Sequence, residues 1–238
     1  MFTPSATYYD ALYTTLGKNY QQEAERLRGL IQQYLRSSGK TLLDVACGTG
    51  GHLQYLQQWF TSEGLDLDEN LLQLARKKLP NTIFHRGDML DFDLHRRFDV
   101  VTCLFSSIGY AATKAKLHQA IRNLQRHVLP RGLLIIEPWL TPEQYLSGVV
   151  HATFVNQPQL KIARMNVSET SDGNKSILNF HYLVGTPDGV QHFTEHHELG
   201  LFTHSEYLEA FVASGIEPIY DESGLEGRGL YLGINSMD

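Results

Sequence analysis

The sequence predicts an α/β protein, built on an open, mostly parallel, doubly wound sheet of seven strands with an antiparallel sheet inserted late in the chain. Two patterns support this prediction. Between residues 42 and 137, short apolar runs typical of buried strands alternate with segments whose apolar residues recur at helical spacing. Between residues 145 and 200, apolar and polar residues alternate instead, and turn signals separate the runs.

The first long helix is expected over residues 20–35, where apolar residues recur every three or four positions. The segment before it is rich in tyrosine, with Tyr8, Tyr9, Tyr13 and Tyr20. Two interpretations fit this segment equally well. It forms a lid over a cofactor, or its rings pack the helix onto the domain.

A glycine-rich turn follows the first predicted strand, Leu42–Val45, and leads into a helical pattern over residues 52–60. Such a turn at the end of a parallel strand commonly forms the floor of a cofactor site, because glycine lets a ligand approach the backbone. The dinucleotide-binding pattern is disfavoured, since Leu53 stands where its third glycine belongs. Gly39-Lys40-Thr41 resembles the end of a phosphate loop, but it precedes the strand and Tyr34 replaces the first glycine.

Carboxylates follow the next two predicted strands. Asp66 ends the second strand, beside the glycine turn, where a carboxylate can accept hydrogen bonds from two ribose hydroxyls. Asp68 is expected to cap the following helix, which Pro80 stops. Asp88 and Met89 follow the third strand and are expected to hold an adenine ring, with an Asx turn as the alternative for Asp88.

The fourth strand, residues 98–105, is an almost continuous apolar run and brings Ser106–Tyr110 to the cofactor side. A helix over residues 113–127, a turn at residues 129–132 and a strand over residues 133–137 complete this part. Thr141-Pro142 predicts a short helix.

The inserted sheet is expected to consist of hairpins that form a roof over the active site. The predicted runs are 149–155, 161–169, 177–184 and 192–201, with turns at residues 171–174 and 187–189. A capping box at Thr203–Glu206 opens a helix that ends at Gly215, and two strands close the sheet. We therefore expect a cofactor-binding core of residues 1–144 and 201–238, with residues 145–200 inserted over the acceptor.

Composition excludes several classes of function. The 238 residues are 42% hydrophobic and 19% charged, with a net charge of -6. The absence of a basic cluster argues against nucleic acid as a partner. No signal-like or membrane-spanning run is found, and Cys47 and Cys103 suit buried, reduced thiols, so we expect a cytoplasmic protein without a membrane partner. No metal site is expected, because strand alternation places His196 and His197 on opposite faces.

The pattern of Asp44, Gly48 and Gly50 resembles the first motif of class I S-adenosylmethionine-dependent methyltransferases. The order of the later motifs narrows the resemblance to the N,N-dimethyltransferases of nucleotide-linked amino deoxysugars, such as those of the desosamine and mycaminose pathways. It rests on residues 44–53, 98–109, 129–139, 179–184, 195–198 and 227–230. One position departs from the family, because Tyr110 replaces a histidine that faces the amine.

The resemblance implies S-adenosylmethionine as cofactor, a small-molecule acceptor with a dTDP-linked amino group, two methylations and a homodimer. Catalytic positions are then Tyr9 and Tyr110, which would orient the amine without acting as a base. The remaining expected site residues are Tyr20, Ala46, Gly48, Gly50, Asp66, Asp88 and Met89 for the cofactor, and Trp139, His181 and Arg228 for the acceptor. Two alternatives remain open: a different small metabolite as acceptor, and a homologue that binds the cofactor without turnover.

Overall fold

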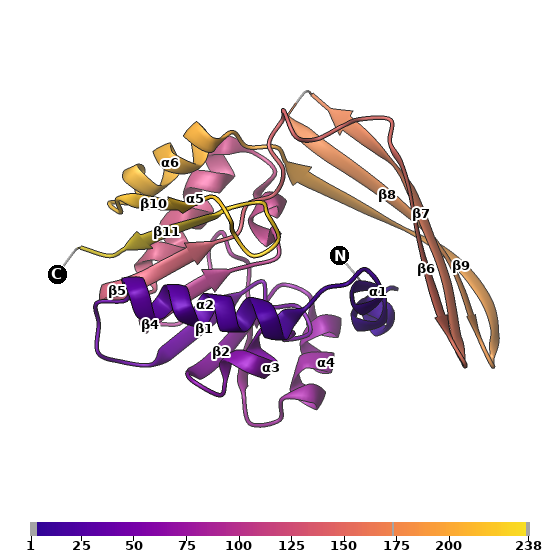
Figure 1. The fold of residues 1–238 in the computed structure, drawn as a ribbon, viewed down its shortest axis with the longest axis horizontal. Coiled ribbons are helices and arrows are strands. Elements are labelled where there is room, and N and C mark those ends of the chain that lie inside the picture. Colours follow the sequence, from indigo (N-terminus) through magenta and orange to yellow (C-terminus); the bar gives the residue numbers. More distant parts are fainter. Residues whose placement is uncertain (1–3, 173, 237–238) are drawn as a thin grey trace.

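The computed structural model describes residues 4–172 and 174–236, and it contains two sheets (Figure 1). The larger sheet has seven strands in the order β10-β11-β5-β4-β1-β2-β3. Only the pairings of β11, with β5 and with β10, are antiparallel. The strands are β1 (Thr41–Val45), β2 (Thr61–Asp66), β3 (Ile83–Arg86), β4 (Phe98–Cys103), β5 (Val128–Ile136), β10 (Pro218–Asp221) and β11 (Leu230–Ile234). The predicted fold class is confirmed.

Helices cover both faces of this sheet because its central strands are apolar on both sides. Leu42 of β1 packs with α2 (Tyr20–Tyr34), α3 (Leu53–Leu56) and α4 (Glu69–Lys78), whereas Leu43 faces α5 (Lys114–Arg126) and α6 (His204–Ala213). Two predicted caps are present, since Asp68 accepts from the backbone N–H of Asn70 and Thr203 forms a capping box with Glu206.

Three local predictions need correction. The helical pattern over residues 52–60 yields only the four-residue α3, with turns on either side. Residues 129–132 lie within β5 at a β-bulge, instead of forming a turn before it. Thr141-Pro142 opens a turn and no helix, because the chain bends there and enters the second sheet.

The second sheet is an antiparallel meander, β6-β7-β8-β9, inserted between β5 and α6. Its strands are β6 (Val150–Gln157), β7 (Leu160–Ser171), β8 (Lys175–Thr186) and β9 (Gly189–Gly200). The predicted turn at residues 171–174 contains Gly173, which lies outside the described residues. The other predicted turn, at residues 187–189, joins β8 to β9.

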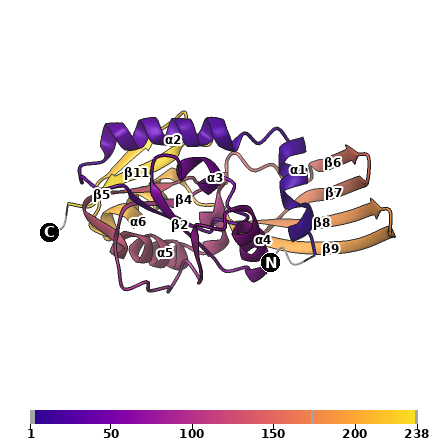
Figure 2. The same ribbon diagram turned by 90° about the horizontal axis from the view of Figure 1, so that it is seen from below.

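The N-terminal segment lies between the two sheets (Figure 2). It comprises a 3-10 turn, η1 (Ala6–Tyr8), and α1 (Tyr9–Thr15). Leu12 of α1 is buried against Val155, Ile162 and Tyr182 on the inner face of the meander. Among the described helices, none is long and apolar enough to cross a membrane.

Asp99 holds the sheet together at the edge opposite the carboxyl ends of β1 and β4. Its carboxylate accepts from the hydroxyls of Ser37 and Thr41, both at 2.6 Å, and from the Thr41 N–H at 3.0 Å. Burial favours the protonated acid, but these hydrogen bonds outweigh it and hold the pKa of Asp99 below its usual value. Asp99 is therefore a charged structural link that does not take part in the cofactor site.

We expect Asp99→Ala to lower the free energy of unfolding by about 1.5 to 3 kcal/mol, the range for hydrogen bonds to a charged group. Because the folded-state pKa of Asp99 is lowered, its contribution is present above the ordinary carboxyl pKa and is lost as the pH falls through the folded value. Urea unfolding at several pH values measures both effects. The control is Asp188→Ala, in the exposed turn between β8 and β9, and equal stability of the two variants would contradict this role.

Candidate active site

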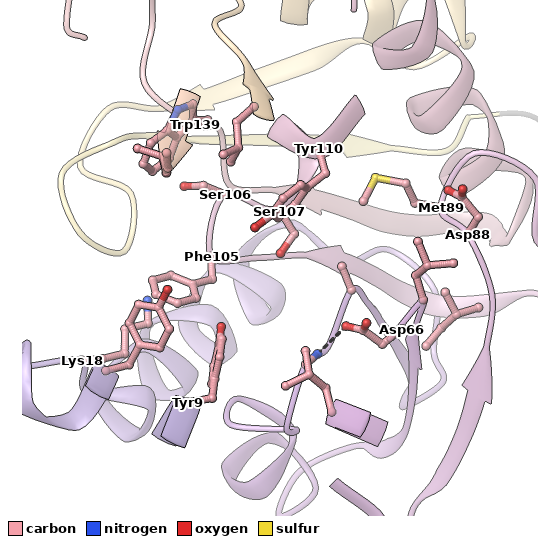
Figure 3. Close-up of a pocket in the computed structure, with 18 of the residues that line it drawn as sticks. Tyr9, Lys18, Asp66, Asp88, Met89, Phe105, Ser106, Ser107, Tyr110 and Trp139 are labelled. Carbon is pink, nitrogen blue, oxygen red and sulfur yellow. Dashed lines mark hydrogen bonds between the residues drawn. The ribbon is translucent and has the colours of Figure 1, made fainter. Parts of the chain in front are cut away.

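A cavity of about 590 Å³ lies where the carboxyl ends of β1, β2, β4 and β5 face the meander. One end of the cavity belongs to the large sheet (Figure 3). The inner face of β7, β8 and β9 forms the other end. Tyr9 and Tyr13 of α1 line it from a third side. Ligand sites are commonly found at this edge of an open α/β sheet.

The glycine turn bends in the left-handed region, as a ligand floor requires. Ala46, Gly48 and Gly50 have φ angles of +58°, +55° and +75°. A Cβ built on Gly48 meets no atom within 4 Å, so the backbone there is open to the cavity. A Cβ on Gly50 instead lies 3.1 Å from the Leu79 side chain, and Gly50 does not line the cavity. Gly50 therefore shapes the turn and its packing on α4, which corrects its expected place in the cofactor site.

Asp66 lies at the tip of β2, as predicted, and its carboxylate is directed toward the turn. One carboxylate oxygen accepts from the Gly48 N–H at 2.7 Å, and the other accepts from the Asp68 N–H at 2.8 Å. Each oxygen of a carboxylate can accept two hydrogen bonds. Asp66 lines the cavity and keeps acceptor capacity there.

Asp88 and Met89 line the same end of the cavity (Figure 3). One oxygen of Asp88 accepts from the Leu90 N–H at 3.0 Å, which is the Asx turn weighed for this residue. The two interpretations are compatible, because the second oxygen remains available for an adenine amino group. The apolar lining of Leu67, Leu71 and Met89 suits the faces of a purine ring.

A smaller pocket adjoins the main cavity, and Tyr9, Ala46 and Gly48 line both. Tyr20 belongs to this smaller pocket, with its ring edge-on to His52 at 5.0 Å. Asp44 lies at its base and is buried, which raises the pKa of this carboxyl to about 6. A carboxylate in a pocket next to the turn suits the charged amino end of a methionine-derived group.

Tyr110 and Trp139 line the opposite end of the cavity, and the ring of Tyr9 faces it from α1 (Figure 3). The Tyr110 hydroxyl lies 3.0 Å from His197 Nδ1, and the Trp139 indole donates to the Ser176 hydroxyl at 2.9 Å. Desolvation raises the pKa of both Tyr9 and Tyr110 well above the usual value. Both phenols therefore stay protonated and act as hydrogen-bonding groups.

The structure places His181 outside the site. Phe180 lines the cavity, and side chains alternate along a strand, so the next residue of β8 points to the outer face. His181 is exposed there and stacks on His192 with ring centroids 6.0 Å apart. The assignment of His181 to the acceptor is corrected accordingly.

Arg228 does line the cavity, but its guanidinium is already paired. It forms an ion pair with Glu226 and lies 3.7 Å from an oxygen of the fully buried Glu137. An arginine has five N–H donors, so these partners leave donors for an anionic ligand. Glu226 would compete with such a ligand, because it also lines the cavity.

Several lining residues are not among the predicted site residues. Arg164 of β7, Phe180 of β8 and Leu199 of β9 reach the cavity from the meander, and Lys18 reaches it from the segment before α2. Alternation predicts which residues of a strand share a face, but it does not tell which face looks inward. No group of His, Cys, Asp and Glu able to hold a metal is found among the described residues.

Comparison with known proteins agrees with this geometry. Residues 42–132, which contain the glycine turn, Asp66 and Asp88, match the methyltransferase domain family. The chain is 41% identical to dTDP-3-amino-3,6-dideoxy-alpha-D-glucopyranose N,N-dimethyltransferase of Streptomyces fradiae, over 96% of this chain and 90% of the relative. It is 39% identical to dTDP-3-amino-3,4,6-trideoxy-alpha-D-glucopyranose N,N-dimethyltransferase of Streptomyces venezuelae, over 96% and 97%.

Solved structures show the same similarity in three dimensions. The crystal structure of Streptomyces venezuelae DesVI superposes with a TM-score of 0.88 at 39% identity, covering 95% of this chain and 96% of the other. An amino pentose methyltransferase from Micromonospora echinaspora, solved with S-adenosylmethionine bound, gives a TM-score of 0.85 at 38% identity, covering 96% of each chain. The chain therefore belongs to the S-adenosylmethionine-dependent N,N-dimethyltransferases of nucleotide-linked amino sugars, and S-adenosylmethionine is its cofactor.

Proposed function

We propose that this enzyme transfers methyl groups from S-adenosylmethionine to the amino group of a dTDP-linked amino deoxysugar. The observation that carries the proposal is that the similarity to three N,N-dimethyltransferases of such sugars extends over 96–97% of the chain. It thus includes the meander, which supplies the far wall of the cavity. These relatives differ in whether the amine is on carbon 3 or carbon 4, so the proposal covers the class of acceptor.

In this proposal the cofactor lies at the glycine turn, held by Asp66 at the ribose, by Asp88 and Met89 at the adenine, and by Tyr20 at the methionine end. The bound cofactor supplies an electrophilic methyl group on a sulfonium. The acceptor amine must approach that methyl group in line and without a proton. Orientation and exclusion of water by the protein are worth up to about 7 to 11 kcal/mol in favourable intramolecular systems.

The acceptor is proposed to bind between Tyr110 and Trp139, below the meander. We infer that the meander is a separate unit that covers the core. Tyr9 and Tyr110 orient its amine, because both hydroxyls stay protonated. Mass spectrometry after incubation with labelled S-adenosylmethionine and a panel of nucleotide-linked amino sugars tests the proposal. We expect one or two labelled methyl groups on a dTDP-linked sugar and none on the same sugar without its nucleotide. Labelling of a different metabolite alone would contradict it.

We expect Asp66→Ala to weaken binding of S-adenosylhomocysteine by about 1.5 to 3 kcal/mol, since the ribose loses hydrogen bonds to a charged group. The turn also loses the bond from the Gly48 N–H. Titration calorimetry measures the affinity. Asp91→Ala is the matched control, because Asp91 is exposed and does not line the cavity. An unchanged affinity in Asp66→Ala would remove this residue from the site.

Substitutions of Arg228 and Glu226 are expected to change the binding of the dTDP diphosphate in opposite directions. If Arg228 binds it, Arg228→Ala weakens dTDP binding by about 1.5 to 3 kcal/mol. Glu226→Gln strengthens it, because the change removes a competing carboxylate and frees the guanidinium. Calorimetry with dTDP measures both variants. A loss of thermal stability in both, with dTDP binding unchanged, would assign the pair to structure alone.

We propose that the protein is a homodimer in which the outer face of the meander is the contact. The support is a set of exposed apolar side chains drawn from all four strands of that face: Val150, Phe154, Met165, Val167, Leu183 and Val190. Exposed apolar side chains gathered on one face commonly mark a site of interaction.

We expect Phe154→Glu to shift sedimentation from dimer to monomer, because the change places a charge within the apolar contact. Val212→Glu on α6 is the matched control, since Val212 is 63% exposed and Phe154 is 59% exposed. A wild-type protein that sediments as a monomer would exclude the dimer.

We also propose a cytoplasmic location. Cys47 and Cys103 are free and buried, as expected of a protein in a reducing compartment. Fractionation of cells that express the protein would check this, and recovery from a secreted fraction would contradict it.

A further inference from the structure

A row of polar side chains leads from the cavity into the protein behind Tyr110. The Tyr110 hydroxyl is 3.0 Å from His197 Nδ1, and His197 Nε2 is 3.7 Å from an oxygen of Glu195. His197 and Glu195 are 2% and 5% exposed, although both lie on a strand whose outer face is solvated. Only Tyr110 reaches the cavity.

The inner end of this row is a fixed carboxylate. Glu195 accepts from the Ser5 N–H at 2.9 Å and from the Ser5 hydroxyl at 2.7 Å. Burial opposes ionisation, but the hydrogen bonds from Ser5 and the nearby His197 ring outweigh it and hold the pKa of Glu195 below its usual value. A carboxylate beside Nε2 favours the His197 tautomer that carries its proton on Nε2. His197 Nδ1 then accepts a hydrogen bond from the Tyr110 hydroxyl.

The chemistry of an N,N-dimethyltransferase makes such a row useful. An amine carries a proton near neutral pH, and each methyl transfer to a neutral amine gives an ammonium ion again. A second transfer therefore needs a second deprotonation. Tyr110 itself is no base, because desolvation raises the pKa of its phenol. A proton taken from the amine has to pass beyond it.

We propose that Tyr110, His197 and Glu195 form a proton relay that deprotonates the acceptor before each methyl transfer. The N–H bond of the ammonium breaks and its proton binds the Tyr110 oxygen, while the hydroxyl proton of Tyr110 moves to His197 Nδ1. The resulting imidazolium is paired with the Glu195 carboxylate. Tyr110 ends the step as it began, and His197 and Glu195 act through it as positioning and proton-accepting residues. The relay rests on the proposed function, since it needs an amine acceptor.

Other charged and titratable groups face the relay from neighbouring elements. Arg164 of β7 stacks on Phe180 at 4.6 Å, and the Phe180 ring lies 5.6 Å from the His197 ring. The pKa of the Tyr110 phenol is also raised by three neighbouring groups, which are Tyr13 of α1, Tyr182 of β8 and Asp66 of β2. Between the two transfers the imidazolium returns its proton through the Tyr110 hydroxyl to water that enters the cavity when the cofactor is exchanged, since Tyr110 is the member of the relay that lines the cavity.

The test compares pH profiles of kcat/KM and the products of wild type, His197→Asn and Tyr110→Phe. At neutral pH we expect each variant to lose about a hundredfold in rate, the lower limit for general base catalysis. The loss should shrink as the pH rises toward the pKa of the free amine, where the acceptor needs no base. At neutral pH the variants should also accumulate the monomethyl product. His196→Asn is the matched control, because His196 is the neighbouring residue on the outer face of β9.

Two further variants separate a relay from a structural role. The double variant Tyr110→Phe with His197→Asn should be no slower than either single variant, because each breaks the same path. Unlike Tyr110→Phe, Tyr110→His should keep the activity at low pH, since an imidazole at this position can also pass a proton from the amine to His197. A loss in His197→Asn that is equal at every pH would overturn the relay and leave His197 a structural residue.

A measurement on the protein without substrates keeps the relay distinct from the proposed function. NMR of protein labelled with ¹⁵N in histidine should show His197 with its proton on Nε2, and Tyr110→Phe should shift the Nδ1 resonance. A proton on Nδ1 would overturn the relay. If wild type binds S-adenosylmethionine but methylates no amine at any pH, the proposed function fails and the relay fails with it, whatever the tautomer.

Discussion

The hydrogen bond between the Gly48 N–H and Asp66 fixes the geometry on which the whole site depends. It joins the turn after β1 to the tip of β2, two parallel strands that end at the same edge of the sheet. The bond is short, at 2.7 Å, and its acceptor is 8% exposed, so water competes with it poorly. Burial raises the pKa of Asp66, whereas the bonds from Gly48 and Asp68 favour the carboxylate. The same interaction therefore sets the backbone of the turn and favours the charged form of a carboxylate that lines the cavity.

The acceptor end depends on a different constraint, which is the position of α1 between the sheets. Asp10 of α1 accepts from the Thr49 hydroxyl and pairs with Lys78, each at 2.6 Å, so α1 is tied to the core. Ser5, just before α1, is tied to Glu195 of the meander. Closing the cavity with α1 excludes water from the cofactor and, through Ser5, also orients the carboxylate behind His197. The N-terminal segment thus both encloses the cavity and supports the proposed proton relay.

The sequence predicted those features that depend on local pattern and failed where a distant element decides. Asp66 and the capping box at Thr203 follow from strand ends and cap spacing, and both are found. Strand alternation also predicted that His196 and His197 lie on opposite faces, because neighbouring residues of a strand point to opposite sides whatever the rest of the fold. It did not reveal that the face of Phe180 looks inward, so His181 was assigned to the wrong side. Thr141-Pro142 carries a genuine helix-start signal, which the path of the chain into the meander overrides.

Charged residues that line one wall of the cavity form a chain of ion pairs. The Lys18 side chain is 2% exposed and pairs with Glu23 at 2.9 Å and with Glu226 at 3.2 Å, and Arg228 connects Glu226 to Glu137. Removing one member of a buried pair leaves an uncompensated charge, which costs about 3 to 5 kcal/mol, whereas exposed pairs contribute about 1 kcal/mol or less. The inner pairs therefore stabilise the position of the segment before α2. The outer pair of Arg228 and Glu226, whose side chains are 21% and 31% exposed, separates at much lower cost. Because Arg228 also pairs with the fully buried Glu137, and Glu226 with the buried Lys18, moving the loop between β10 and β11 as a whole would break buried pairs, so this wall is held to the core at both residues.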